Sequence, residues 1–243
     1  MTWTIATYHP VSLFSLRPAN STTSGGKTLI APTPFCIKMA LLSASIQTTG
    51  VTEGQRRFPQ IRDLRIALAL PKQVVVVKSF AKIRRPFESK DAKTREQKIA
   101  ELAEKGQYPF QSTIAYREFV QFGGLLQIAF TAPQGEAPAW LSEMLPVINY
   151  LGKRGSFVQI AGWPQLAEAL DDTFTEVTRD STTFSSNGTL QMLDDCGNQM
   201  TFEHADIYNP KRMSFGKERV PRHVVLPYRL KQSSRGYSLY ERL

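Results

Sequence analysis

Apolar and polar residues alternate along several stretches of the chain, and a period of two residues is typical of a half-buried strand. In residues 2–8, "TWTIATY", this alternation is combined with β-branched side chains. A similar pattern, or an extended apolar run, recurs at intervals up to residue 162. We therefore predict strands over 2–8, 63–71, 72–87, 112–122, 125–132 and 156–162.

Helical periodicity appears in two places between these strands. Residues 32–48 place Phe35, Met39 and Leu42 at helical spacing, and Thr33 followed by Pro34 is a good helix start. Residues 137–152 also favour a helix, in which Pro146 is expected to cause a kink or a second turn. The charged segment 88–106 has little apolar face and is predicted to be a short helix or a mobile loop.

The resulting order is strand, helix, strand, long excursion, strand, helix, strand. Without the excursion this is the βαββαβ order of an α+β, ferredoxin-like fold, which is also the fold of RNA-recognition domains. We expect this core over 1–162, with residues 72–118 inserted as a basic, thumb-like hairpin. From 163 to 243 short strand candidates at 173–180, 189–195, 198–208 and 222–230 predict a small β-rich C-terminal domain.

Charge is distributed unevenly. The net charge is +9, and residues 56–98 hold 13 Lys or Arg against 4 Asp or Glu. Residues 162–210 hold 1 against 9, and residues 211–243 hold 9 against 2. This pattern predicts a basic track for a polyanion and an acidic patch facing another protein. The alternative is that the fold interleaves these segments, so that their charges neutralise one another.

Several classes of protein are disfavoured. No apolar run approaches the roughly 20 residues that span a bilayer, and the first residues lack the cationic start of a signal peptide. Cys36 and Cys196 have no metal-ligand neighbour at short spacing, so we expect reduced, packed thiols in a cytoplasmic protein. "SGGKT" at 24–28 resembles the end of a P-loop but lacks the upstream glycine. We expect no cofactor, no metal and no membrane partner.

The stretch "YLGKRGSFVQIAG", residues 150–162, allows two interpretations. In the first, Gly152 and the cations Lys153 and Arg154 form a helix C-terminus, where glycine and positive charge are both favoured. In the second, the stretch is a loop that holds a phosphate backbone against its main-chain N–H groups.

Catalytic chemistry has a weak candidate. RNA cleavage without metal needs a positioned general base and acid, and His9 follows the first strand beside Tyr8, with Lys27 possible as a third group. A single histidine at a strand end is more often a surface or packed residue, and this constellation therefore carries little weight.

Two motifs are similar to those of a known family. "TPFCIKMALL" at 33–42 resembles the proline-initiated first helix of the RAMP superfamily of CRISPR-associated proteins, and "YLGKRGSFVQI" at 150–160 resembles its glycine-rich loop. Within that superfamily the chain resembles CRISPR-associated protein family five, which caps the 5′ end of the guide RNA in Cascade. It departs from the family pattern at Met39-Ala40-Leu41, where the family has Gly-Ala-Leu.

The resemblance implies a non-catalytic RNA-binding subunit of a type I Cascade complex in the cytoplasm of a prokaryote, because no Lys-His pair matches that of the cleaving branch. Its implied partners are the 5′ handle of the guide RNA, the backbone RAMP subunit, the large subunit and target DNA near the PAM. The candidate RNA-binding residues are Gly152, Lys153, Arg154, Gly155, Ser156, Lys27, Thr33, Lys38, Lys78, Lys82, Arg84, Arg85 and Phe87.

Two other functions remain open at this stage. The chain could be a RAMP endoribonuclease that processes precursor RNA, with His9 as the test residue. It could also be a general RNA-binding protein without a CRISPR role. "REFVQFGG" at 117–124 has aromatic residues but lacks the stacking motif of the RNA-recognition domain, which weakens this last alternative.

Overall fold

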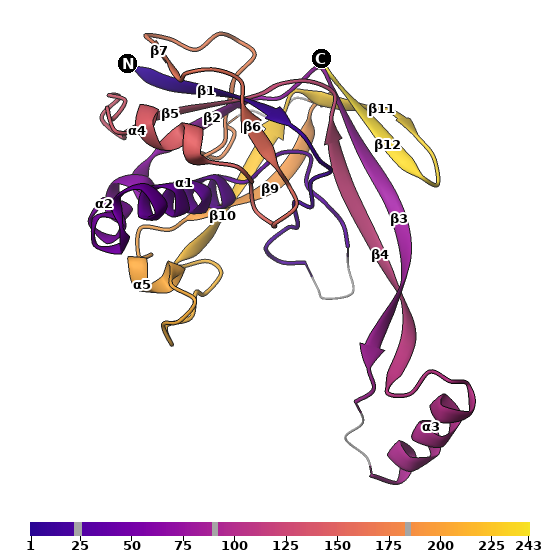
Figure 1. Ribbon diagram of the computed structural model, residues 1–243. Coiled ribbons are helices and arrows are strands. Elements are labelled where there is room, and N and C mark those ends of the chain that lie inside the picture. Colours follow the sequence, from indigo (N-terminus) through magenta and orange to yellow (C-terminus); the bar gives the residue numbers. More distant parts are fainter. Residues whose placement is uncertain (22–25, 89–91, 183–185) are drawn as a thin grey trace.

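The computed structural model describes residues 1–21, 26–88, 92–182 and 186–243 and has a mixed α/β fold with antiparallel sheets (Figure 1). The largest sheet joins strands that lie far apart in the chain, in the order β6-β1-β5-β2-β8, and β7 also pairs with β1. Its strands are β1 (Trp3–Pro10), β2 (Arg65–Ala69), β5 (Leu126–Thr131), β6 (Val158–Ile160), β7 (Gln165–Ala167) and β8 (Thr175–Glu176). Every neighbouring pair is antiparallel.

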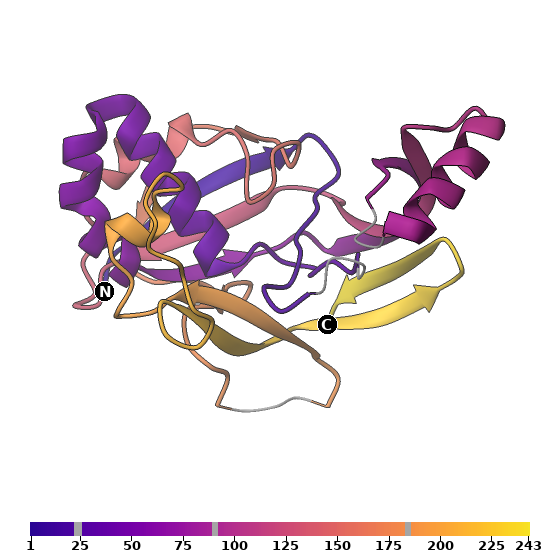
Figure 2. The same cartoon turned by 90° about the horizontal axis from the view of Figure 1, so that it is seen from below.

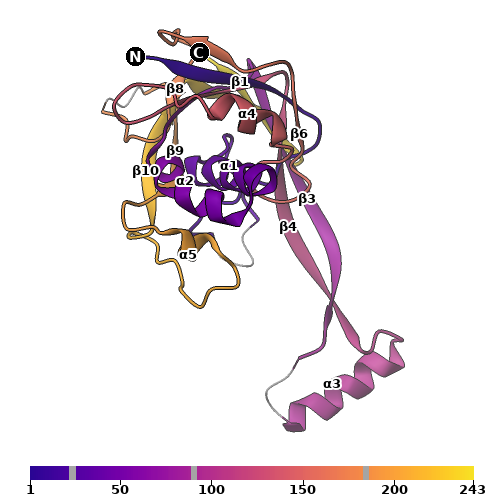
Figure 3. The same ribbon diagram turned by 60° about the vertical axis from the view of Figure 1, so that its left-hand side comes forward.

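Two consecutive helices follow β1. Helix α1 (Pro34–Thr49) begins as predicted, since the Thr33 hydroxyl oxygen accepts a hydrogen bond from the Cys36 N–H and Pro34 occupies the first turn. It ends at Gly50, whose φ of 86° reverses the chain into α2 (Val51–Asp63). Figure 3 shows α1 between the large sheet and the ribbon formed by β9 (Thr189–Cys196) and β10 (Arg219–Leu226).

The predicted excursion is a long hairpin that leaves the body of the molecule. Strands β3 (Gln73–Pro86) and β4 (Phe110–Phe122) pair from Val74–Phe122 out to Pro86–Phe110. Helix α3 (Ala92–Glu104) lies at its far end (Figure 3). At its base β3 also pairs with β12 (Tyr237–Arg242), which in turn pairs with β11 (Tyr228–Ser233). Figure 2 shows α3 and the helices α1 and α2 at opposite ends of the molecule.

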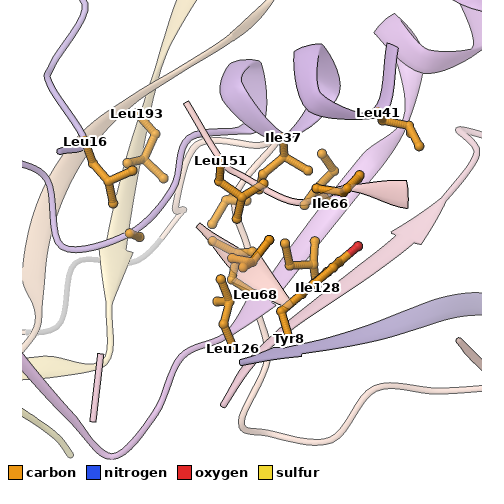
Figure 4. Packing of buried hydrophobic residues seen from close by; sticks show 14 of the residues in the cluster. Tyr8, Leu16, Ile37, Leu41, Ile66, Leu68, Leu126, Ile128, Leu151 and Leu193 are labelled. Carbon is orange, nitrogen blue, oxygen red and sulfur yellow. The ribbon is translucent and has the colours of Figure 1, made fainter. Parts of the chain in front are cut away.

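One large cluster of buried side chains holds these layers together. Ile37 and Leu41 of α1 pack toward Tyr8, Ile66 and Ile128 of the sheet (Figure 4). Leu193 of β9 and Tyr228 of β11 belong to the same cluster, so residues on both sides of position 162 share it. The predicted two-domain division at residue 162 stays a prediction.

Three expectations about local structure were wrong. The helix predicted over 137–152 is reduced to α4 (Leu141–Met144) and a separate 3₁₀ turn, η1 (Leu145–Val147), which contains Pro146 and is the second turn expected at that proline. The strand predicted over 198–208 contains α5 (Phe202–Ala205), which begins where the His204 ring nitrogen Nδ1 accepts from the Thr201 N–H. The strand predicted over 173–180 is only two residues long.

Candidate nucleic-acid interface

The residues around the two glycines form a short hairpin, here called the glycine hairpin (residues 150–157). Tyr150 and Phe157 pair as an antiparallel bridge across its base. The turn is closed by two hydrogen bonds, from the Ser156 N–H to the Lys153 carbonyl and from the Leu151 N–H to the Ser156 carbonyl, both of 3.0 Å. Because the preceding helical turn ends at Val147, the helix-cap interpretation of Gly152 is wrong.

The glycine hairpin is fastened to the loop that follows β1. The Ser12 hydroxyl donates to the Gly155 carbonyl at 2.6 Å and accepts from the Phe157 N–H at 2.7 Å. The Ser15 N–H donates to the Ser156 hydroxyl oxygen at 3.2 Å. Ser156 is 1% exposed, so its side chain anchors the hairpin rather than lying on its surface.

The tip of this hairpin suits an anion. Gly152 and Gly155 have φ angles of 76° and 101°, a region that other residues rarely adopt. Lys153 and Arg154 lie exposed between them. Within the described residues, no main-chain N–H from 152 to 155 donates a hydrogen bond. Two cations and a run of unengaged N–H groups can therefore contact a phosphate without first breaking an internal bond.

Two predicted RNA-binding residues of α1 have structural partners instead. Thr33 is 5% exposed and caps the helix. Lys38 is 1% exposed, and its ammonium donates to the Asp195 carboxylate at 2.6 Å and to the Arg62 carbonyl at 2.7 Å. Burial raises the pKa of Asp195, while the Lys38 ammonium opposes that shift. Neither side chain offers surface to a phosphate.

Lys27 lies where the loop before α1 crosses the base of the long hairpin. Its neighbour Gly26 packs on β4, where a Cβ atom would lie 1.9 Å from the Tyr116 carbonyl oxygen, and the Glu118 N–H donates to the Gly26 carbonyl at 2.7 Å. The Thr28 N–H donates to the Glu118 carboxylate at 3.0 Å. The segment 26–28 is thus a packing element, which leaves the Lys27 side chain exposed. Residues 24 and 25 of the P-loop-like "SGGKT" lie outside the described residues.

The cations predicted on the outgoing arm of the long hairpin have different surroundings. Lys82, Arg84 and Arg85 are exposed. By contrast, the Lys78 ammonium donates to the Ser233 hydroxyl at 3.4 Å and the Ser234 carbonyl at 3.1 Å, which ties the hairpin to the β11–β12 turn. Phe87 is half-buried where the hairpin meets α3, and its N–H donates to the Pro109 carbonyl.

Apolar side chains alternate with cations on this hairpin. Lys82 pairs with Ile114, and Phe80 pairs with Tyr116, so all four project from the same face. Phe80 is 63% exposed although its ring centroid lies 5.1 Å from that of Tyr116, and Ile114 is 73% exposed. Exposed rings beside cations are the combination with which proteins hold single-stranded nucleic acid.

The three histidines have separate surroundings. His9 is an exposed residue of β1 opposite Gln159, His204 belongs to the start of α5, and His223 lies 3.4 Å from Asp180. Across the described residues, no group of three or more His, Cys, Asp or Glu is placed to hold a metal ion. No helix among the residues that the structure describes is long and apolar enough to cross a membrane.

Sequence reasoning missed the surroundings of the glycine hairpin. Arg219 on β10, Tyr150 and Phe35 line a cavity beside it, and none was predicted as a site residue. No short sequence pattern joins these cavity residues, because they come from segments more than 60 positions apart. Only the "YxxKRG" context hinted at an aromatic residue next to the cations.

A comparison with curated proteins supplies a relative. The chain is 34% identical over 93 residues to the CRISPR-associated protein Cas5 of Archaeoglobus fulgidus. This chain has a Cas5 homologue. The resemblance to CRISPR-associated protein family five that the sequence predicted is therefore confirmed. The aligned stretch spans 36% of this chain and 41% of the relative. No family model matches the chain.

Solved structures show weaker likenesses. A CRISPR protein from Archaeoglobus fulgidus aligns with a TM-score of 0.46 and 12% identity, covering 100% of this chain and 92% of that one. A chain of a CRISPR RNA-guided surveillance complex aligns with a TM-score of 0.41 and 14% identity, covering 92% and 91%. Both scores are too low to establish a common fold.

Proposed function

We propose that this chain is a non-catalytic RNA-binding subunit of a Cascade-type CRISPR effector, and that it caps the 5′ handle of the guide RNA. The observation that carries the proposal is the tip of the glycine hairpin, where Lys153 and Arg154 are exposed between two left-handed glycines. The Cas5 homologue supports the CRISPR context. The proposed partners are the guide RNA, the backbone RAMP subunit, the large subunit and target DNA near the PAM.

The topology is consistent with a ferredoxin-like core. Strands β6, β1, β5 and β2 are neighbours in that order, every adjacent pair is antiparallel, and a helical segment follows both β1 and β5. This is the strand order of a split βαβ fold. In such a fold the loop before the last strand lies at one end of the sheet, and here that loop is the glycine hairpin.

The long hairpin supports a second contact with the same RNA. Its cations Lys82, Arg84 and Arg85 neutralise phosphates in this proposal, and the exposed Phe80 and Ile114 press on an unstacked base. We propose that the hairpin acts as a thumb on the nucleotides just downstream of the 5′ handle. Lys78, which is hydrogen-bonded at the hairpin base, holds the thumb rather than the RNA.

The test exploits a matched pair of dipeptides. Lys153→Ala/Arg154→Ala is expected to weaken binding of a 5′-handle RNA and to flatten the salt dependence by about 0.7 units of slope per lost phosphate contact, because counterions are no longer released there. Lys211→Ala/Arg212→Ala removes the same two cations from another exposed loop and serves as the control. If both variants lose the same affinity and slope, binding reflects net charge alone and the proposal fails.

A cleavage assay on the same purified protein distinguishes a capping subunit from an endoribonuclease. We expect no cleavage of a precursor repeat RNA by the purified chain, with or without divalent metal, and no change on His9→Ala. Specific products that disappear in the His9→Ala variant would instead assign the chain to the processing enzymes.

A further inference from the structure

A cavity of about 410 Å³ lies between the first turns of α1 and the glycine hairpin. A cavity of this size falls within the range of small-ligand sites. Its walls are mostly apolar, formed by Phe35, Met39 and Ala40 on one side and Tyr150 on the other. Lys153 also lines it, so the cavity shares a residue with the proposed phosphate contact.

A flat cation is fixed in the wall of this cavity. The Arg219 guanidinium carbon lies 4.2 Å from the centroid of the Phe35 ring, and its Nε donates to the Asp194 carboxylate at 2.6 Å. The Asp194 side chain is 3% exposed and that of Arg219 is 29% exposed. The buried carboxylate therefore holds a guanidinium against an aromatic ring while part of the guanidinium stays accessible from the cavity.

The other oxygen of Asp194 has no hydrogen-bond partner within the described residues. Its charge is therefore balanced mainly by Arg219, which keeps that side chain in place. Removing the guanidinium would leave a buried carboxylate unpaired, a change that proteins tolerate poorly. The stacked pair of Phe35 and Arg219 is thus a rigid surface rather than two independent side chains.

The hairpin lies beside the first turn of α1, and residues of both line the cavity. A Cβ atom added to Gly152 would lie 3.7 Å from the Cys36 Cβ and 4.0 Å from its Sγ, so a gap about one methyl group wide separates the hairpin main chain from the helix there. Burial raises the pKa of the Cys36 thiol to about 12, and the Asp194 carboxylate adds to this shift. The thiol is therefore uncharged at neutral pH, so this part of the cavity lining is suited to an apolar face.

We infer that this cavity takes one unstacked nucleobase of the bound RNA, whose adjoining phosphate lies on Lys153 and Arg154. The inference rests on the proposed RNA-binding function and deepens it. Single-stranded RNA is recognised by splaying bases out and stacking them on aromatic rings or arginine planes, and the Phe35–Arg219 pair and Tyr150 provide both surfaces. A basic entrance and an apolar interior match the two ends of a nucleotide.

The test uses handle RNAs in which one base at a time is removed to leave an abasic site. For the intact protein, one position is expected to lose about 5- to 150-fold in affinity, the effect of one stacked base, while its neighbours lose little. Ala40→Phe should fill the cavity and weaken binding of the unmodified RNA. It should also abolish the additional loss of affinity that the abasic site causes at the sensitive position. Ser43→Phe, which adds the same ring on α1 beside a neighbouring cavity, is the control.

A second measurement keeps the inference testable if Ala40→Phe does not fold. A 4-thiouridine placed at the sensitive position should crosslink on irradiation to peptides containing Phe35 or Tyr150. The inference would be overturned if the affinity were the same for an abasic site at every position, or if crosslinks were confined to the long hairpin. If Ala40→Phe left the affinities for the abasic RNAs unchanged but weakened assembly with a neighbouring subunit, the cavity would hold a protein side chain. That result would also overturn the inference.

These outcomes are distinct from failure of the proposed function. If the chain does not bind handle RNA with a salt dependence set by Lys153 and Arg154, the function itself is wrong. If that binding is present but an abasic site at any position has the same effect on affinity, the proposed phosphate contact is retained and only the base pocket is wrong.

Discussion

The ion pair between Lys38 and Asp195 joins α1 to β9 inside the molecule. Both side chains are almost fully buried, at 2% and 4% exposure. Asp195 also accepts from the Cys196 N–H at 2.8 Å, and Lys38 also reaches the end of α2 through the Arg62 carbonyl. A lysine that looked like an RNA-binding cation in the sequence thus connects three elements of the core.

We expect Asp195→Ala to destabilise the protein by about 3–5 kcal/mol, because it leaves the Lys38 ammonium buried without its partner. The double variant Lys38→Met/Asp195→Leu replaces both charges by apolar groups and should recover most of that loss. Urea unfolding midpoints measure both effects. A single variant as stable as the parent would show that the ammonium reaches water or another partner.

The same double variant addresses the RNA-binding prediction for Lys38. If it binds handle RNA as tightly as the parent, Lys38 serves the fold alone. A loss of affinity without a loss of stability would return Lys38 to the interface.

At the scale of elements, most strands were predictable because their pattern was local. The strands β1, β3 and β4 follow from the alternation or apolar runs of their own residues. Helix α2 was missed because "VTEGQRRFPQIRD" contains Gly54 and Pro59 and has few apolar residues. It is stabilised by burial of Phe58 and Ile61 in the common core, which no local pattern reveals.

The candidate site divides in the same way. The cations of the glycine hairpin could be found from a short motif, since glycines that flank charges indicate a tight turn. The cavity could not, because its aromatic and guanidinium walls meet only after α1, the glycine hairpin and β10 have packed together. Thr33, Lys38 and Ser156 were among the RNA-binding residues that the family resemblance implied, but all three are buried and have structural partners.

The long hairpin is an element that can be shortened without touching the core. Among its described residues from 83 to 113, none is buried, whereas Val74, Val76, Val120 and Phe122 at its base are. Deleting 83–113 and joining Lys82 to Ile114, which are register partners, through an Asn-Gly turn should preserve the fold. We expect the thermal midpoint to change little and nuclease protection of the guide RNA's 5′ handle to be lost.

A charge-only variant sharpens this prediction. Lys82→Gln/Arg84→Gln/Arg85→Gln keeps the hairpin and its exposed rings, so it should weaken binding in a salt-dependent way while retaining part of the protection. Full protection by the shortened chain would mean that the hairpin does not act as a thumb.

At the scale of the whole molecule, the uneven charge of the sequence is partly neutralised by the fold. Carboxylates of the acidic segment 162–210 pair with cations from elsewhere in the chain: Glu176 with Arg65, Asp194 with Arg219, and Asp195 with Lys38. The alternative in which the fold interleaves charged blocks therefore accounts for part of the acidic segment. Lys153 and Arg154 of the glycine hairpin and Lys82, Arg84 and Arg85 of the long hairpin stay exposed.

The cluster of buried side chains also predicts how the chain unfolds. Leu193, Val224 and Tyr228, all beyond residue 162, are buried in the same cluster as Tyr8 and Ile128. We therefore expect one calorimetric transition for the whole chain, and no cooperative transition for a fragment that ends at residue 162. Two separate transitions, or a folded fragment, would show instead that the chain divides at residue 162 into two domains, as the sequence predicts.

A single atom can test that coupling within the intact chain. The Tyr228 hydroxyl, buried on β11, donates to the Pro71 carbonyl before β3 at 2.5 Å. Tyr228→Phe keeps the ring but leaves that carbonyl unsatisfied, which costs about 1–3 kcal/mol. In a single cooperative unit this loss lowers the stability of β1 and β5 as much as that of β9 and β10, as measured by hydrogen exchange of their amides. Protection lost only in β9 to β12 would show that the two parts unfold separately.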